Sequence, residues 1–529
     1  MNKLKIVIII LIPLILVAQT QRWGYFYNGT AASLDDAYRV VCVEDGNIYT
    51  TGFSMGSGSG SDFVIISVNS AGSERWVYRF NDPGNNDATG QSLVYGSDGN
   101  IHATGYQLHN DTSDFIVLSV TTSGTQRWVY NYAGSGEDNA GNAICYGNDG
   151  NIYATGFSSA GNVDLTVISL TANGTQRWIY NYSGVGNSDD RGNSILYGPD
   201  GNIYIAGRSS VNNNPDFIVI SLTSSGTERW VYRYNGPGNS EDVARALVYG
   251  TDGNIYAAGY SVGTALRDFT VISLTTSGNE RWVYRYNRQG NENDEAYSLI
   301  YGLDGNIYAV GYCGGSNDDD CAVISLTNTG SERWVYIYNG TGNIFDRAYA
   351  LDHDQNNNIY AAASTCALNS DFTVISLTST GTQRWLYSYN GIGNATDEAY
   401  DIVYGADGNV YAAGNSQNPG KDIAIISLTS GSGIEENSMQ PLPNSPFRIT
   451  ASTIQNRNLT YQLSVPEPLT FKLSLFTVQG EKIISWEHTC QKGISNNTKN
   501  IPALSPGVYI IRAETNIGEK ESKKIIIAK

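Results

Sequence analysis

The sequence is poor in charge and in the residue types from which catalytic and metal sites are usually built. Only 16% of its 529 residues are charged, and it holds four histidines, six cysteines and three methionines. The histidines show no metal-ligand spacing, and neither a G-x-S-x-G nucleophile elbow nor a phosphate-binding loop occurs. The composition therefore carries no enzyme signature, and we predict no cofactor from it.

The six cysteines are too few and too scattered for a disulfide framework in a chain of this length. Cys313 and Cys321, in GYCGGSNDDDCAV, flank one short loop. They would form a local disulfide if their strands pair, and two buried thiols are the alternative.

Helical periodicity and long apolar runs are also missing. No segment sustains a 3.6-residue apolar period, so we expect almost no helix. One apolar run stands at residues 1–18, behind Lys3 and Lys5, and it is shorter than the roughly 20 residues that a membrane span needs. We interpret it as a secretory signal peptide, with a retained membrane anchor as the alternative. No other stretch is apolar enough to cross a bilayer, so we predict no transmembrane span in the mature protein.

Lysine is almost absent from the body of the chain, where Lys421 is the only one between residues 19 and 446. The whole chain carries −18, of which residues 447–529 contribute +5 and the rest −23. An acidic body of this kind repels phosphates, which argues against nucleic-acid binding. The charge change follows a Pro-, Ser- and Asn-rich run at 431–446, which we interpret as a linker between domains at 19–430 and 447–529.

Aromatic residues and glycine are abundant, and they recur in a repeat. An Arg-Trp pair returns every 50 to 53 residues, an Asp precedes an apolar run in each copy, and the turn DGN occurs in seven copies. The seventh copy has NNN at 356–358 instead. These markers predict eight repeats, whose tryptophans are Trp23, Trp76, Trp128, Trp178, Trp230, Trp282, Trp334 and Trp385.

Residues 294–343 illustrate one repeat. DEAYSLIYG leads into a tight Asp-Gly turn, NIYAVGY returns, CAVISLT is an apolar β-branched run, and RWVYIYN follows another turn. Four short antiparallel strands every ~50 residues are typical of a β-propeller blade. The third strand is apolar almost throughout, which indicates burial on both faces between packed blades. A solenoid is the rival architecture.

The N-terminus distinguishes the two architectures. QTQRWGYFYNG at 19–29 is the end of a repeat with no repeat before it, and the eighth repeat lacks its own Arg-Trp strand. If the first strand of each repeat is innermost, residues 22–28 would pair beside 422–429 and close the ring. We therefore predict an all-β fold, an eight-bladed β-propeller closed by an N-terminal outer strand, followed by a small C-terminal β-sandwich.

The repeats resemble those of bacterial eight-bladed propellers with short β-propeller repeats. In TTSGNERW, Gly278 stands four residues before Trp282, and other blades keep this G-x-x-x-W spacing. The spacing is similar to the tryptophan-docking motif of quinone-dependent dehydrogenase propellers, which implies that each Trp packs between neighbouring blades. The adjacent cysteines and the acidic calcium site of those enzymes have no counterpart here, so the resemblance does not extend to the quinone.

Residues 447–529 contain four strand patterns and resemble the type A C-terminal sorting domain of the type IX secretion system. The matching features are LFTVQGEKI at 475–483, LSPGVYIIRA at 504–513 and the terminal KKIIIAK at 523–529. The resemblance implies the type IX machinery as a partner, export across the outer membrane, removal of the tail, and a secreted or cell-surface location. A plain accessory sandwich is the alternative.

Each predicted inner strand begins at an acidic position. Eight carboxylates around one rim would bind Ca²⁺ if several oxygens converged on one ion, but each Asp equally well caps the backbone of its own turn, and its recurrence in every blade favours capping. Calcium is the one metal this pattern admits, and its candidate ligands are Asp35, Asp190, Asp242, Asp294, Asp346 and Asp397.

Two functions fit these observations. The first is a binding or adhesion scaffold for a protein or glycan, with contacts from rim loops such as 208–215, 260–267 and 312–320. The second is an exported glycan-active enzyme, a hydrolase or lyase, with carboxylates at the inner strand ends. Residues that break the repeat are the better site candidates, because few ligands have eightfold symmetry; they are His102, Arg191, Arg208, Arg245 and Arg347.

Overall fold

The computed structural model describes residues 21–431 and 448–527, apart from short loop segments within those ranges. Its contacts divide the chain into two compact units, Met1–Ser432 and Gly433–Lys529. Every regular element in the described residues is a β-strand. The expected signal peptide at 1–18 and linker at 431–446 lie almost wholly outside the described residues.

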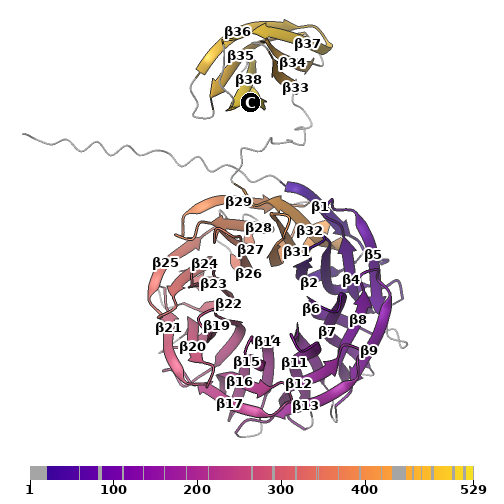
Figure 1. The fold of residues 1–529 in the computed structure, drawn as a ribbon, viewed down its shortest axis with the longest axis vertical. Coiled ribbons are helices and arrows are strands. Elements are labelled where there is room, and N and C mark those ends of the chain that lie inside the picture. The colour runs from indigo at the N-terminus through magenta and orange to yellow at the C-terminus, as the bar shows by residue number, and fades with distance from the viewer. Residues whose placement is uncertain are drawn as a thin grey trace, which may run out of the picture. The chain divides into compact units, whose positions relative to one another are not determined.

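The first unit consists of eight four-stranded antiparallel sheets arranged around a central axis (Figure 1). Sheets 1 to 4 comprise β2 (Asp35–Cys42), β3 (Ile48–Met55), β4 (Ser61–Val68) and β5 (Glu74–Phe80); β6 (Ala88–Tyr95), β7 (Asn100–His109), β8 (Thr112–Thr121) and β9 (Gln126–Tyr132); β10 (Asn139–Tyr146), β11 (Asn151–Ser159), β12 (Val163–Thr171) and β13 (Gln176–Tyr182); and β14 (Asp190–Tyr197), β15 (Asn202–Val211), β16 (Asn214–Thr223) and β17 (Glu228–Tyr234).

The other four sheets follow the same order from the inner to the outer strand. They comprise β18 (Asp242–Tyr249), β19 (Asn254–Val262), β20 (Arg267–Thr275) and β21 (Glu280–Tyr286); β22 (Asp294–Tyr301), β23 (Asn306–Gly314), β24 (Asp319–Thr327) and β25 (Glu332–Tyr338); β26 (Arg347–His353), β27 (Ile359–Cys366), β28 (Ser370–Leu377) and β29 (Gln383–Tyr389); and β30 (Asp397–Tyr404), β31 (Asn409–Asn418), β32 (Gly420–Thr429) and β1 (Gln21–Tyr27).

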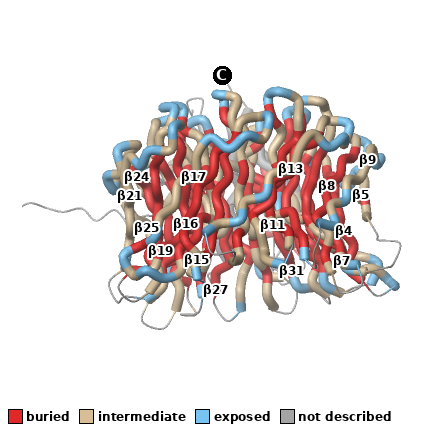
Figure 2. The backbone as a smooth tube through the Cα atoms, turned by 90° about the horizontal axis from the view of Figure 1, so that it is seen from below, coloured by how far each residue is buried: buried red, intermediate tan, exposed pale blue. Residues whose placement is uncertain are grey.

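The core lies between the sheets. The third strand of sheet 1 has Phe63, Val64, Ile65 and Ile66 all at 0% exposure, as its unbroken apolar run predicts for a strand covered on both faces. Each buried cluster of the first unit draws on two neighbouring sheets, and Figure 2 shows burial along the strands with exposure at the loops of both ends. Packing between sheets, estimated at roughly 25 cal/mol per Å² of buried apolar surface, is therefore the main source of stability.

Tight turns join the first two strands of each sheet. Gly305 in the DGN turn of sheet 6 has φ +76°, a conformation that glycine adopts without strain. In the seventh copy Asn357 occupies this position with φ 56°. Asparagine is among the few other residues that tolerate this region, which explains how NNN replaces DGN there.

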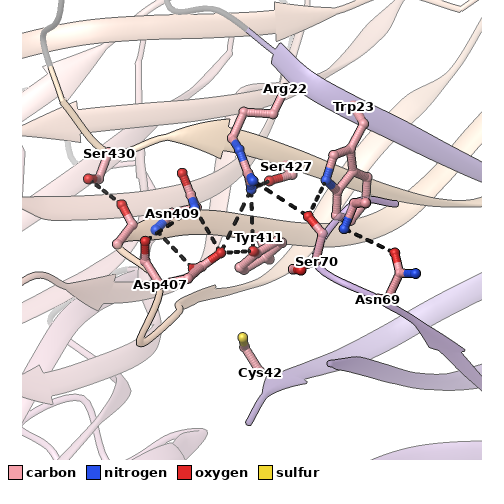
Figure 3. A network of polar contacts seen from close by, with 12 residues as sticks. Arg22, Trp23, Cys42, Asn69, Ser70, Asp407, Asn409, Tyr411, Ser427 and Ser430 are labelled. Carbon is pink, nitrogen blue, oxygen red and sulfur yellow. Dashed lines mark hydrogen bonds and ion pairs between the residues drawn. The ribbon is translucent and has the colours of Figure 1, made fainter. Parts of the chain in front are cut away.

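The N-terminal strand β1 completes the last sheet. It pairs antiparallel with β32, from Gln21 opposite Leu428 to Tyr27 opposite Ile423. Arg22 donates to Ser427 Oγ at 2.8 Å within this sheet, and the Trp23 indole N–H donates to the Ser70 carbonyl of sheet 1 at 2.9 Å (Figure 3). Strand β1 therefore links sheet 8 to sheet 1.

Sheets 1 and 8 also share a core. Val40, Ile48 and Val64 of sheet 1 pack in one buried cluster with Tyr411 and Ile425 of sheet 8. The same cluster type joins sheets that are consecutive in sequence, so the interface between the first and last sheets is built like the others.

The second unit contains two sheets. One has β33 (Arg448–Gln455), β34 (Asn458–Val465) and β37 (Gly493–Asn500); the other has β36 (Lys482–Cys490), β35 (Leu469–Thr477), β38 (Gly507–Thr515) and β39 (Lys520–Ile527). Tyr461 of the first sheet and Phe471 and Leu473 of the second belong to one buried cluster. Over the described residues, the structure contains no helix long and apolar enough to span a bilayer.

Candidate functional site

The six candidate carboxylates are buried, and each caps the backbone of its own sheet. Asp35 accepts the Gly29 amide at 2.7 Å through Oδ2 and the Met55 amide at 3.0 Å through Oδ1. The same pair of amide donors, six residues back and twenty residues on, recurs at Asp190, Asp242, Asp294, Asp346 and Asp397. The acidic position therefore holds the loop that enters each inner strand, as the capping interpretation predicts.

Sheets 2 and 3 depart from this pattern. Their inner strands begin with Ala88 and Asn139, and Asp87 lies one residue earlier, where it accepts the Ser61 amide at 2.7 Å. No group of three ligating side chains that could hold a metal occurs among the described residues. Calcium binding by the rim carboxylates stays a prediction.

Burial sets the ionisation of two of these caps. Removal from water raises the pKa of Asp294 and of Asp346 from 3.8 to about 6, against the opposing effect of the backbone amides that each accepts. A raised carboxyl pKa means that the folded protein binds protons more readily than the unfolded chain between these two values.

We therefore expect the free energy of unfolding to increase as the pH falls from 7 through about 6 towards 4, and the contribution of these two groups to be lost as the pH rises through about 6. Chemical denaturation at a series of pH values measures this slope. The double variant Asp294→Asn/Asp346→Asn should show a shallower slope over that window, whatever its absolute stability. An unchanged slope in the variant would show that other groups cause it.

The eight tryptophans lie on the outer strands and pack on the following sheet. Seven of the indole N–H groups donate to a backbone carbonyl of the next sheet at 2.9 to 3.1 Å. A Cβ added to Gly278 would lie 2.6 Å from the Trp230 ring, so this position accepts only glycine beside the indole. The Gly of each G-x-x-x-W thus receives the Trp of the preceding sheet, not its own.

Trp385 differs from the other seven. It is 1% exposed, and its Nε1 has no hydrogen-bond partner among the described residues. It faces sheet 8, where the chain leaves the repeat after Thr429 and no further outer strand follows in sequence.

The arginines beside the tryptophans bind side chains of their own sheet, and several of them also donate to a backbone carbonyl of the next sheet. Arg75 donates to Tyr49 Oη at 3.0 Å and to Ser67 Oγ at 2.8 Å, and its guanidinium carbon lies 5.8 Å from the Tyr49 ring centroid. The aromatic partner therefore comes from the second strand of the same sheet. These arginines are part of the scaffold.

Of the two alternatives for Cys313 and Cys321, the structure has two free, buried thiols. Tyr312 is the register partner of Cys321, and Asp320 is that of Cys313. The two cysteines are thus offset by one residue on paired strands, which directs their side chains to opposite faces of the sheet. The sequence left both alternatives open because the loop length does not determine the register.

A β-bulge in each inner strand leaves one residue unpaired, and we call the surface that these residues form the inner face. In sheet 1 the pairing skips Tyr38, between Ala37 and Arg39. The same irregularity recurs in every other sheet, so eight bulge residues follow one another around the axis: Tyr38, Gln91, Asn142, Asn193, Arg245, Tyr297, Tyr349 and Tyr400.

Four of the bulge residues form a continuous aromatic surface, which we name the tyrosine crescent: Tyr297, Tyr349, Tyr400 and Tyr38. Successive ring centroids lie 5.5, 5.4 and 6.0 Å apart, across sheets 6, 7, 8 and 1. All four side chains are half-buried. The sequence carried a signal for them, an Ala-Tyr pair in four of the eight inner strands, which the repeat markers obscured.

The other four bulge residues are polar. The amide of Asn142 donates to the Gly192 carbonyl of the next sheet at 2.8 Å, and Asn193 makes the equivalent bond to Ala244. Arg245 lies between this polar half and the crescent, with its guanidinium 4.8 Å from the Tyr297 ring centroid. The inner face is therefore divided into an aromatic half and a hydrogen-bonding half.

Charged pairs border the crescent on both flanks. Glu295, 1% exposed, receives Arg245 at 2.7 Å on Oε2 and Arg267 on Oε1. On the other flank, Lys421 of sheet 8 lies 3.0 Å from Asp36 of sheet 1, so the only lysine of the repeats joins the first and last sheets.

The repeat-breaking residues predicted as site candidates separate into two groups. Arg191 and Arg208 both bind Asp189, at 2.7 and 2.6 Å, and Arg347 binds Asp319 at 2.5 Å. These pairs, like Arg245 with Glu295, lie at the ends of strands where the inner strands begin. His102 lies near the opposite end, fully buried, at the position that tyrosine occupies in the other repeats.

The comparisons with known proteins identify the second unit. Residues 455–528 match the family described as the secretion system C-terminal sorting domain. The prediction of a sorting domain is thereby confirmed, and the domain indicates export by the type IX secretion system to the cell surface or the extracellular space. No curated protein matches the chain.

Several solved structures resemble the chain at low identity. Sqt1 of Chaetomium thermophilum is 10% identical, covers 78% of this chain and 98% of its own, and gives a TM-score of 0.48. The polysaccharide lyase Uly1 is 10% identical over 79% of this chain and 100% of its own, with a TM-score of 0.42. A PL25 ulvan lyase is 11% identical over 74% and 93%, with a TM-score of 0.39. Similarity at this level carries no information about activity.

Proposed function

We propose that the first unit is an eight-bladed β-propeller, closed by its N-terminal strand, that binds neutral glycans at its inner face once the sorting domain has directed its export. Eight sheets with inter-sheet cores, and the pairing of β1 with β32, support the closed propeller. Removal of residues 447–529 after export, and release or surface attachment of the propeller, belong to the same proposal.

The tyrosine crescent is the observation that carries the glycan proposal. Sugar rings present C–H faces that pack on aromatic faces, and their hydroxyls need amide, carboxylate or guanidinium partners beside those rings. The inner face supplies both, because the crescent lies next to Arg245 and follows the same bulge positions as Asn142 and Asn193. Four consecutive blades carry a half-buried tyrosine at the bulge position. A closed ring does not require tyrosine there, since the other four blades have polar side chains at the same position.

Charge selects among glycans. Residues 1–446 carry −23, and the arginines near the crescent are already paired with Glu295, Asp319 and Asp189. Long-range repulsion therefore disfavours polyanionic saccharides and leaves neutral ones.

The glycan-active enzyme is the second candidate, and Glu295 is the residue that favours it. This carboxylate lies buried beside the crescent, where two arginines converge on it. Both of its oxygens are occupied by guanidinium groups, so neither is free to contact a substrate as acid or nucleophile. Binding is therefore the better-supported function.

The test is a screen of neutral oligosaccharides against the purified protein, followed by calorimetric titration of the best ligand with three variants. Tyr349→Ala removes a central ring and should weaken binding about tenfold or more, which corresponds to ~1.4 kcal/mol. Tyr349→Phe, which keeps the ring, should bind within a few-fold of the wild type. Tyr232→Ala, on an outer strand, is the matched control and should bind unchanged.

Binding that is indifferent to Tyr349→Ala, or a protein ligand in place of any glycan, would contradict the proposal. Shortening of the oligosaccharide during the titration, detected by mass spectrometry and abolished by Glu295→Gln, would instead support the enzyme.

A further inference from the structure

A cavity of about 360 Å³ opens on sheet 2, on its boundary with sheet 1 and away from the crescent. Its walls include Phe80 at the end of sheet 1 and Ile116 of sheet 2. Its polar groups are Gln107, His109, Asp114 and Asn131. Asn131 is exposed and Gln107 is buried, so the cavity leads from solvent to a buried amide.

In three other sheets of the protein, an arginine side chain occupies the position equivalent to this cavity. In sheet 1, the Arg79 guanidinium binds Asp62 at 2.6 Å, Ser54 Oγ at 2.8 Å and the hydroxyl of Tyr27 from the preceding sheet at 2.9 Å. Arg233 of sheet 4 repeats the arrangement with Asp216, Ser209 and Tyr182. Arg285 of sheet 5 binds Asp268 in the same way at 2.5 Å. The repeat thus builds a guanidinium pocket and fills it with its own arginine.

Sheet 2 keeps the carboxylate of this pocket and loses the cation. Asp114 occupies the place of Asp62, while Asn131 stands where Arg79 stands in sheet 1, and its amide reaches Asp114 at 2.9 Å. Phe80 replaces the tyrosine whose hydroxyl accepts the guanidinium in sheets 1 and 4. The shorter side chains leave the cavity where the arginine would lie.

A second observation points to a ligand. Gln107 replaces the pocket serine, is 6% exposed, lines the cavity, and its Oε1 has no hydrogen-bond partner among the described residues. A buried carbonyl oxygen without a donor is unfavourable, because it has lost its hydrogen bonds to water and gained none in the protein. A guanidinium entering from solvent would donate to both Gln107 Oε1 and Asp114, and it would lie beside the Phe80 ring.

We propose that this cavity binds the guanidinium group of an arginine side chain from a partner polypeptide. The shape of the cavity, the charge of Asp114 and the unpaired oxygen of Gln107 all suit a guanidinium group. The internal arginines of sheets 1, 4 and 5 show how such a group is held at this position. The net charge of −23 on residues 1–446 attracts such a cation from a distance. The cavity lies apart from the inner face, so the test of this proposal is independent of the test of glycan binding.

The test titrates the purified protein with N-acetyl-L-arginine methylamide and with the matching citrulline compound, which has the same shape without the charge. The arginine compound should bind saturably, and the citrulline compound about tenfold or more weakly. Asn131→Arg restores the internal arginine and should abolish binding while raising the melting temperature. Asn181→Arg, the same change at the same repeat position of sheet 3, is the matched control and should bind like the wild type.

Absence of saturable binding, equal binding of citrulline, or binding that survives Asn131→Arg would each overturn the proposal. If Asn131→Arg does not fold, Asp114→Asn replaces it, with loss of arginine binding as the expected result and retention as the contradicting one.

Discussion

Deletion of residues 19–29 is expected to destabilise the first unit far more than deletion of residues 447–529. The deletion removes β1, which leaves the outer edge of β32 unpaired, and it removes the Trp23 contact to Ser70 of sheet 1. The interface between sheets 1 and 8 then loses its outermost layer, and the expected cost exceeds ~5 kcal/mol, the scale of a whole domain's stability. Thermal and denaturant unfolding of the two truncated proteins measure the difference.

A permuted chain tests whether the lost stability comes from the missing strand itself or from its position in the sequence. Attaching residues 19–29 behind residue 431 through a short Gly-Ser turn, after deleting them from the N-terminus, returns the strand to the same edge of β32. This protein should recover most of the lost stability. A 19–29 deletion that melts like the intact protein would refute ring closure by β1.

The second large effect is expected for Trp385→Ala. Trp385 is 1% exposed and packs in the core between sheets 7 and 8, so its removal opens a large apolar cavity. Truncation of a buried Trp typically costs about 3–5 kcal/mol. Because its indole N–H has no partner among the described residues, this cost is one of packing without a lost hydrogen bond.

Trp230→Ala is the matched comparison. Trp230 is only half-buried and donates to the Thr276 carbonyl at 3.0 Å, so it should lose less packing and about 1 kcal/mol of hydrogen bonding. Denaturant midpoints of the two variants give the order. A midpoint for Trp385→Ala at or above that of Trp230→Ala would contradict the larger contribution expected of Trp385.

Local patterns were sufficient for the strands. The predicted strands of residues 294–343 correspond to β22, β23, β24 and β25 within a few residues. The reason is that Asp-Gly and Thr-Gly turns are short-range signals, and the apolar pattern of a strand indicates which of its faces are buried. The orphan Arg-Trp segment at 19–29 predicted its own partner, since a count of eight inner strands and seven later outer strands leaves one edge open. The β1–β32 pairing agrees with that prediction.

The local sequence patterns did not predict the register between paired strands or the direction of individual side chains. Cys313 and Cys321 fail to bridge because a single-residue offset places them on opposite faces, and the guanidinium of Arg75 finds its tyrosine in its own sheet. Both depend on how paired strands align, which one-dimensional spacing does not specify.

By itself, the sequence determined the repeat number, the four-strand unit, the acidic caps, the sorting tail and the displaced strand, because each depends on turn chemistry, periodicity or counting along the chain. Only the tertiary structure decided that Tyr38 lies beside Tyr400, 362 positions away, and that sheet 2 holds a cavity where sheets 1, 4 and 5 hold an arginine. The physical reason is that both features arise where different sheets, or different strands of one sheet, meet. Side chains there are brought together by the curvature of the ring and by the register of strand pairs, and neither is encoded in any one local segment.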